Sequence, residues 1–238
     1  MAWLQGEEDE SLPPLNKTCI QRWRNLNPTW DVNILSEETI SDYVPEYWDI
    51  IKSSPNAHWR RWGRRARSAH KTDLLRLLLL DKYGGVWADA SLYPRLPLDD
   101  FWKEIMNETG FFAYRYLPRS YGPMGRRDTC VFFLCSDGPN NYLIRRWKEN
   151  FTDAFRLPHK DKHNKGRGFI YFTMAQTLCD LYDSDPKVKD IMDNMVLLKH
   201  DPVHSALANW KERNLSSYMY KRPAFPAGDP RRSRPKKS

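Results

Sequence analysis

The sequence predicts an α/β fold, and three observations carry this prediction. Residues 73–83 form a leucine-rich run of helical length, and two glycines end it. Residues 86–88, which directly follow the glycines, are β-prone and too few to form anything but a short buried strand. Two further apolar segments, 111–114 and 131–135, have the length and composition of strands. Segments of helical character separate these strands, as expected for alternating helices and strands.

The leucine-rich run predicts a helix that is buried on most sides, because leucines occupy nearly all of its faces. Thr72 is expected to cap a helical turn, and Asp73 suits the positive N-terminal end of a helix. Arg76 follows Asp73 by three positions, so the two side chains are expected to meet. The pair could be a structural ion pair or could belong to a binding site, since burying charge is costly unless the charge is paired.

The other expected elements are read from apolar periodicity and turn residues. They are a helix at 11–27, a strand at 30–35, a short helix beginning at 36–39, a helix after 96–101, a turn at 138–142 leading into a helix through 147, a mobile loop at 157–168 and a helix at 170–182. No internal repeat is visible.

Asp89 and Ser91 stand where the first of these strands ends. Ligands of open α/β sheets bind outside the carboxyl ends of the strands, which favours a binding role for these two side chains. Gly84 and Gly85 allow a backbone to approach closely, because glycine has no Cβ. Asp89 could equally cap a turn, and the local pattern leaves both interpretations open.

Two linked motifs resemble a known family. Thr72-Asp73-x-x-Arg76 and then Tyr83-Gly-Gly-Val-Trp-Ala-Asp89-Ala-Ser91 are similar to motifs of the capsular-polysaccharide-synthesis glycosyltransferases. That group is related to sugar transferases with a DXD motif, which include yeast-type α-1,6-mannosyltransferases and the glucosylating domains of clostridial toxins. Residues 5–35 and 202–204 look like the first and last parts of the same fold, although only the central segment is specific.

The resemblance implies a GT-A fold, a single α/β domain with a mixed, mainly parallel sheet flanked by helices. It also implies transfer of a sugar from a nucleotide-diphosphate donor to a glycan or other hydroxyl acceptor, with retention of configuration and help from Mn²⁺ or Mg²⁺. The donor-sugar and nucleotide-binding residues carried over are Trp3, Asp73, Arg76, Gly84, Gly85, Trp87 and Asp89. The residues expected to bind the metal are Asp89, Ser91 and His204.

The chain departs from the family pattern in two places. Ser91 stands where relatives place a second carboxylate, and a hydroxyl is the weaker ligand for a hard cation. The first strand is expected to be clipped, since only residues 2–6 remain of it, and Trp3 could stack on a nucleotide base or fray. His204 could contact metal or phosphate, or could be structural. These departures favour a rival interpretation, a catalytically inactive nucleotide-sugar-binding protein of the same fold.

Length, composition and charge bear on the domain organisation and on possible partners. The 238 residues are expected to form one domain over 1–222 and a basic, Pro-rich disordered tail over 223–238. The net charge is +8, and much of it lies in the tail. Residues 58–67 together with this tail could form a nucleic-acid surface, which is a third interpretation and one that we do not favour.

Several features of the sequence bear on the cellular compartment in which the protein is expected. No apolar run approaches the length of a membrane span, and the acidic N-terminus does not fit a secretory signal. The chain as given therefore reads as cytoplasmic, while a Golgi or secretory lumen would require an anchor outside this sequence. Four sequons, at Asn16, Asn107, Asn150 and Asn214, hint at such a lumen. The four cysteines lack zinc-site spacing, and Cys130 and Cys135, which flank an expected buried strand, are expected to be core thiols.

Overall fold

The computed structural model describes residues 2–5, 14–54, 64–116, 129–157, 173–196, 199–200 and 219–221. Its strands are β1 (Ala2–Gln5), β2 (Val32–Leu35), β3 (Gly85–Asp89), β4 (Leu92–Pro94), β5 (Phe111–Tyr116), β6 (Thr129–Ser136), β7 (Lys199–His200) and β8 (Met219–Lys221). Its helices are α1 (Pro14–Leu26), α2 (Ile40–Tyr43), α3 (Tyr47–Ser53), α4 (Arg64–Tyr83), the 3₁₀ turn η2 (Leu98–Asp100), α5 (Trp102–Met106), α6 (Tyr142–Phe155), α7 (Thr173–Ser184) and α8 (Pro186–Asn194).

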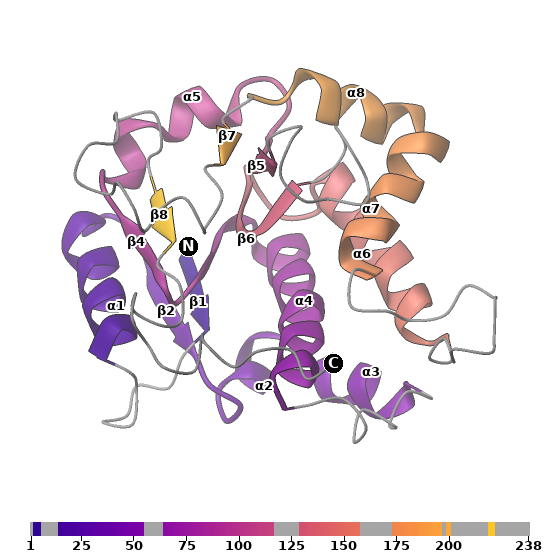
Figure 1. Ribbon diagram of the computed structural model, residues 1–238, viewed down its shortest axis with the longest axis horizontal. Helices are drawn as coiled ribbons and strands as arrows, with labels where there is room; N and C mark the ends of the chain where they lie inside the picture. The colour runs from indigo at the N-terminus through magenta and orange to yellow at the C-terminus, as the bar shows by residue number, and fades with distance from the viewer. Residues whose placement is uncertain are drawn as a thin grey trace, which may run out of the picture.

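Six strands form one sheet in the order β2-β1-β3-β6-β5-β7, and β4 pairs with β8 in a separate two-stranded sheet (Figure 1). In the large sheet, β1 runs parallel to both β2 and β3, and β5 runs parallel to β7. Strand β6 is antiparallel to both of its neighbours, β3 and β5. The fold is therefore mixed α/β, as expected, with parallel and antiparallel pairings side by side.

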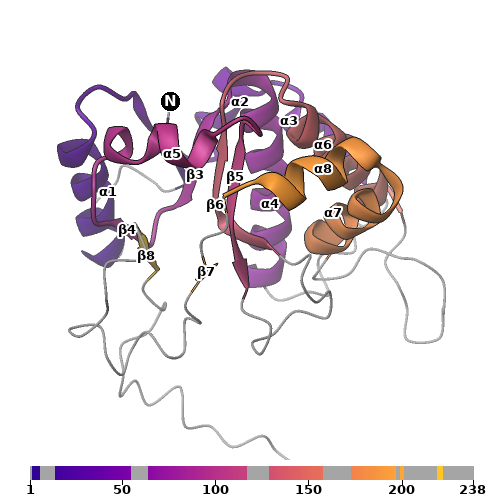
Figure 2. The same ribbon diagram turned by 90° about the horizontal axis from the view of Figure 1, so that it is seen from above.

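Helices cover both faces of the large sheet. Figure 2 shows α1 and α5 on one side of the strands, and α4, α6 and α7 on the other. Strand β3 illustrates why two layers form, because successive side chains of a strand point to opposite faces. Val86 and Ala88 enter the core beneath α1 and α5, whereas Trp87 enters the core beneath α4 and α6. All three residues are buried.

The segment expected to be a clipped strand forms β1, four residues long, at the inside of the sheet. Its residues pair in register on both sides, with Leu4 facing Ile34 of β2 and Ala88 of β3. Pairing on two edges gives even a short strand a full set of backbone partners, which explains why it forms.

Helix α4 begins earlier than expected. Its twenty residues start at Arg64, so Thr72 and Asp73 lie in its interior and neither is at its N-terminus. The residues that precede Thr72 include good helix formers, Arg and Ala, and no proline or glycine interrupts them within the helix. The C-terminal end is as predicted, because the helix stops at Tyr83 and Gly84 follows with a positive φ of 68°.

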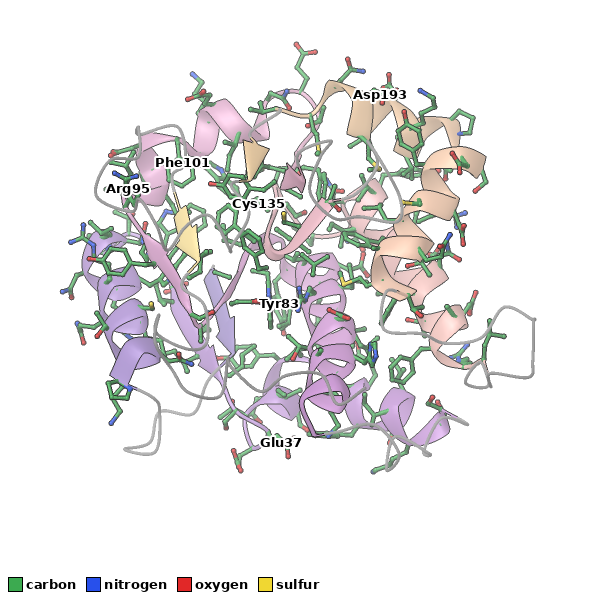
Figure 3. The ribbon with its side chains drawn as sticks, in the orientation of Figure 1. Glu37, Tyr83, Arg95, Phe101, Cys135 and Asp193 are labelled. Carbon is green, nitrogen blue, oxygen red and sulfur yellow. The ribbon has the colours of Figure 1, made fainter. Side chains whose placement is uncertain are left out.

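The leucines of α4 are all buried, as the pattern predicted. Cys130 and Cys135 are buried free thiols, as predicted, and Cys19 and Cys179 are buried free thiols as well. Cys135 lies in the interior on β6 (Figure 3), where burial raises the pKa of its thiol well above the usual value. A thiol held in its protonated form is inert, so Cys135 is a packing residue and no nucleophile.

Among the residues that the structure describes, none of the helices combines the length and the apolar character that a membrane crossing requires. The expected mobile loop at 157–168, apart from its first residue, and the expected tail at 223–238 lie outside the described residues.

Candidate donor-sugar site

The candidate site lies at one edge of the large sheet, where three parallel strands end together. In the register of the sheet, Gln5 at the end of β1 pairs with Leu35 at the end of β2 and with Asp89 at the end of β3. Such an edge is where open α/β sheets place their ligands, because the loops that follow the strands diverge there. Asp89 is the carboxylate at this edge that the sequence singled out.

Matching lengths of helix and strand bring Asp73 to the same edge. Ten positions separate Asp73 from the end of α4 at Tyr83, which is about 15 Å at the rise of an α-helix. Four positions separate Gly85 from Asp89 along β3, which is about 13 Å at the rise of a strand. Because the chain reverses direction at Gly84, the two lengths nearly cancel and Asp73 arrives beside Asp89.

Arg76 lies between the two carboxylates. Its Nη2 atom is 3.2 Å from Oδ1 of Asp73 and 3.9 Å from Oδ1 of Asp89. The side chains of Arg76 and Asp73 are only 5% and 11% exposed, whereas that of Asp89 is 26% exposed. The cluster is therefore buried at Arg76 and opens to solvent at Asp89.

Further contacts fix the guanidinium of Arg76. Its Nε donates to the carbonyl oxygen of Thr72 at 3.3 Å, and its Nη1 donates to the carbonyl oxygen of Val131 in β6. Its Cζ atom lies 5.3 Å from the centre of the Trp87 ring, within range of a cation–π contact. Helix α4 and strands β3 and β6 thus hold Arg76 from three sides.

Trp87 is completely buried, and its indole points toward the cluster. Its Nε1 donates to Oδ1 of Asp89 at 3.2 Å, two positions further along the same strand. With no exposed surface, the ring offers no face on which a sugar or a base could stack in this structure. The geometry favours a role for Trp87 behind Asp89.

His70 is a member of the cluster that the sequence reasoning missed. It is buried one turn before Asp73 in α4, with Nδ1 at 3.7 Å from Oδ2 of Asp73. The two residues stand three positions apart, which is the spacing of helical neighbours, so the signal was present in the sequence. It was overlooked because the helix was expected to begin only near Thr72.

The two glycines lie away from this cluster, at the opposite end of β3 from Asp89. A Cβ built on Gly84 would lie 2.5 Å from the carbonyl carbon of Gly138, which follows β6. The close approach that Gly84 permits is therefore between two parts of this chain. Gly85 also has a positive φ, 83°, which favours glycine for conformational reasons alone.

The chain matches the model of the family described as "Capsular polysaccharide synthesis protein" over residues 1–221. This match spans nearly the whole sequence. The chain belongs to the capsular polysaccharide synthesis family. The membership agrees with the resemblance carried by the two motifs around Asp73 and Asp89.

Two relatives of the chain are named as glycosyltransferases. O-glycosyltransferase PaGT of Phomopsis amygdali is 25% identical over 148 residues, which is 60% of this chain and 35% of PaGT. Glycosyltransferase afumC of Aspergillus fumigatus is 29% identical over 92 residues, which is 34% of this chain and 21% of afumC. The chain therefore spans about a third or less of the length of these relatives.

A solved structure titled "PaToxG Glycosyltransferase" is similar over 81% of this chain and 72% of its own. The sequence identity is 17% and the TM-score is 0.46.

The metal-binding residues expected from the capsular polysaccharide synthesis family are only partly in view. Ser91 is half-buried in the turn between β3 and β4, two positions after Asp89. Over the described ranges, no group of three or more His, Cys, Asp or Glu side chains is arranged to hold a metal ion. One carboxylate and one hydroxyl fit a divalent cation only if donor phosphates supply further oxygens, as is common for Mg²⁺.

Of two further expected site residues, the structure describes the backbone of Trp3 and does not describe His204. Trp3 lies in β1, where it pairs in register with Trp87 of β3 and Asn33 of β2, so its backbone is one strand away from the cluster. His204 lies outside the described residues. Their roles toward base and metal stay predictions. Most of the basic segment 58–67 also lies outside the described residues.

Proposed function

We propose that the protein is a glycosyltransferase that moves a sugar from a nucleotide-diphosphate donor to a hydroxyl acceptor, such as a glycan. The observation that carries this proposal is the Asp73–Arg76–Asp89 cluster at the carboxyl edge of three parallel strands. Family membership and the names of the two relatives support it. The mixed sheet with helices on both faces is compatible with the GT-A fold that we propose for the chain.

We assign different roles to the two carboxylates because their exposure differs. Asp73 forms an ion pair with Arg76 and is nearly buried, so it would present a fixed acceptor for hydroxyl groups of the donor sugar. Asp89 is the more open group and would contact the ribose and the cation. Arg76 lies close to both carboxylates, at 3.2 Å and 3.9 Å, so its positive charge holds the two side chains together at the site.

Asp89 and Ser91, with oxygens of the donor diphosphate, would hold Mn²⁺ or Mg²⁺. A bound cation would offset the negative charge that builds up on the leaving diphosphate. Asp89 supplies the charged ligand and Ser91 a neutral one, so we expect weak cation binding without donor and stronger binding with it. We extend the proposal to a hexose donor and to retention of configuration, both of which follow from the family resemblance alone.

The experiment that tests this function is a donor screen. The purified protein is incubated with UDP- and GDP-linked sugars in Mn²⁺, and the release of nucleotide is measured with and without hydroxyl acceptors. Release from one donor, faster than from the others, is the expected result. If none of the donors is turned over but one is bound tightly, the protein is a binding protein without activity.

That second function has one observation in its favour, which is Ser91 in place of a second carboxylate. A non-catalytic protein of this type would still need the Asp73–Arg76 pair to hold a sugar. Calorimetry with the same donors separates the two functions, because only the enzyme consumes the donor during the titration.

A further inference from the structure

We propose that Trp87 is a positioning residue that fixes the two charged groups of the donor site from behind. The inference rests on the proposed function and adds a residue that acts through Asp89 and Arg76 without touching the donor. One buried indole makes both contacts. Its N–H donates to Oδ1 of Asp89 at 3.2 Å, and its ring face lies 5.3 Å from Cζ of Arg76.

The position of Trp87 in β3 explains why one side chain can reach both groups. Alternation along the strand turns Trp87 toward α4, from which Arg76 projects, while Asp89 follows two positions later on the same face. The ring is wholly buried in the core formed by α4 and α6. Packing therefore fixes the indole, and the indole in turn fixes the carboxylate.

The contacts on Asp89 show what the indole contributes. Arg76 lies 3.9 Å from Oδ1 of Asp89, beyond hydrogen-bonding distance, so its attraction is electrostatic and sets no direction. The Trp87 N–H donates to the same oxygen within hydrogen-bonding distance, and a hydrogen bond does set direction. Asp89 is the most exposed member of the cluster, so a directional bond matters most for this side chain.

The test exploits a matched tryptophan elsewhere in the chain. Trp147 in α6 is equally buried, and its Nε1 also donates within the protein, to the carbonyl oxygen of Met174 at 3.0 Å. Trp87→Phe and Trp147→Phe thus remove the same N–H group and the same volume from two parts of the interior. Phenylalanine at position 87 keeps an aromatic face for Arg76, so the lost hydrogen bond to Asp89 is the change being tested.

Calorimetry of UDP and GDP binding in Mn²⁺, with thermal melts of each preparation, gives the readouts. We expect both variants to melt at lower temperatures than the wild type by similar amounts. Only Trp87→Phe should weaken nucleotide binding, by about tenfold or more, as is typical when a residue that orients a ligand-binding group is changed. In an Asp89→Ala background, which lacks the oxygen that accepts from the indole, Trp87→Phe should have no further effect on nucleotide binding, because its effect passes through the side chain of Asp89.

Three results would overturn the inference. They are equal weakening by Trp147→Phe, wild-type affinity in Trp87→Phe, and a full effect of Trp87→Phe in the Asp89→Ala background. If Trp87→Phe does not fold, benzothienylalanine at position 87 replaces it, since sulfur takes the place of the N–H at nearly constant shape. A wild-type protein that binds neither nucleotide overturns the proposed function, and it is recognised before any variant is made.

Discussion

Arg76 lies between Asp73 and Asp89, with Nη2 3.2 Å from Oδ1 of the first and 3.9 Å from Oδ1 of the second. The arrangement makes Asp73→Asn an informative change. Arg76 keeps its bonds to the carbonyl oxygens of Thr72 and Val131, so the guanidinium stays partnered. We expect a folded variant that loses no more than about 3 kcal/mol of stability. Its turnover should fall by about a hundredfold, because a misplaced substrate group costs that much.

The matched control for this change is Asp81→Asn, which replaces a second buried carboxylate of the same helix. Asp81 pairs with Lys148 of α6 and has no part in the proposed site. Thermal melts, nucleotide binding and turnover are measured on one preparation of each variant. Wild-type turnover in Asp73→Asn, or equal loss of turnover in both variants, would contradict the role given to Asp73.

Gly84→Ala is expected to destabilise the fold strongly. The residue has φ of 68°, and an added Cβ would lie 2.5 Å from backbone of Gly138, which cannot give way as a flexible side chain could. We expect a loss of more than about 2 kcal/mol in urea unfolding. Gly138→Ala is the control, because a Cβ at that position meets nothing within 4 Å. A stable Gly84→Ala variant that binds donor poorly would instead support the donor-binding role that the sequence suggested.

The contacts of Asp99 predict that the stability of the fold depends on pH. Hydrogen bonds from Thr29 at 2.6 Å and from Trp30 at 2.8 Å lower the pKa of the Asp99 carboxyl. A carboxyl whose pKa is lower in the folded state stabilises the fold above its unfolded pKa, which is about 3.9, and loses that contribution as the pH falls through the folded value. Asp99→Asn should therefore be less stable than the wild type at pH 7, and the difference should shrink by pH 3.

Urea unfolding at the two pH values measures this difference. Asp100→Asn, one position further on, controls for the loss of a negative charge in the same turn, since both bonds are made to Asp99. A gap between wild type and Asp99→Asn that is as large at pH 3 as at pH 7 would show that ionisation of Asp99 does not matter.

Ser91 offers a test of the cation. If its hydroxyl faces the bound metal, Ser91→Asp should tighten Mn²⁺ binding in the presence of UDP or GDP, since a carboxylate is the charged, harder ligand. Ser91→Ala should weaken it. Calorimetric titration of nucleotide, first in Mn²⁺ and then in chelator, gives two nucleotide affinities for each protein. Their ratio reports how much the cation contributes to binding. Equal nucleotide affinities with cation and chelator in all three proteins would remove the cation from the proposal.

The sequence predicted the parts of the fold that depend on neighbouring residues. The end of α4, the turn at Gly84 and the strand that follows were readable because glycine conformation and leucine burial are local properties. The beginning of α4 could not be predicted, because Arg64 and the residues after it carry no strong signal for the start of a helix. Helix α8 was missed although Asp185 and Pro186 form a recognisable start, with Asp185 accepting from the backbone N–H groups of Lys187 and Val188.

Features that depend on distant parts of the chain were out of reach. The antiparallel insertion of β6 between β3 and β5 and the pairing of β4 with β8 join segments far apart in sequence. For the site, the sequence named Asp73, Arg76 and Asp89, and the structure brings these three together. It could not show that Trp87 is buried behind Asp89, or that Gly84 packs on Gly138, because both facts depend on tertiary contacts.

The most direct test of the donor-site proposal is a comparison of wild type with Asp89→Asn in the donor assay. The substitution keeps the size of the side chain and removes the charge at the exposed corner of the cluster. We predict that the wild type releases nucleotide from at least one UDP- or GDP-sugar in Mn²⁺, and that Asp89→Asn, with a near-normal melting temperature, does so about a hundredfold more slowly. Equal rates for the two proteins would contradict the account.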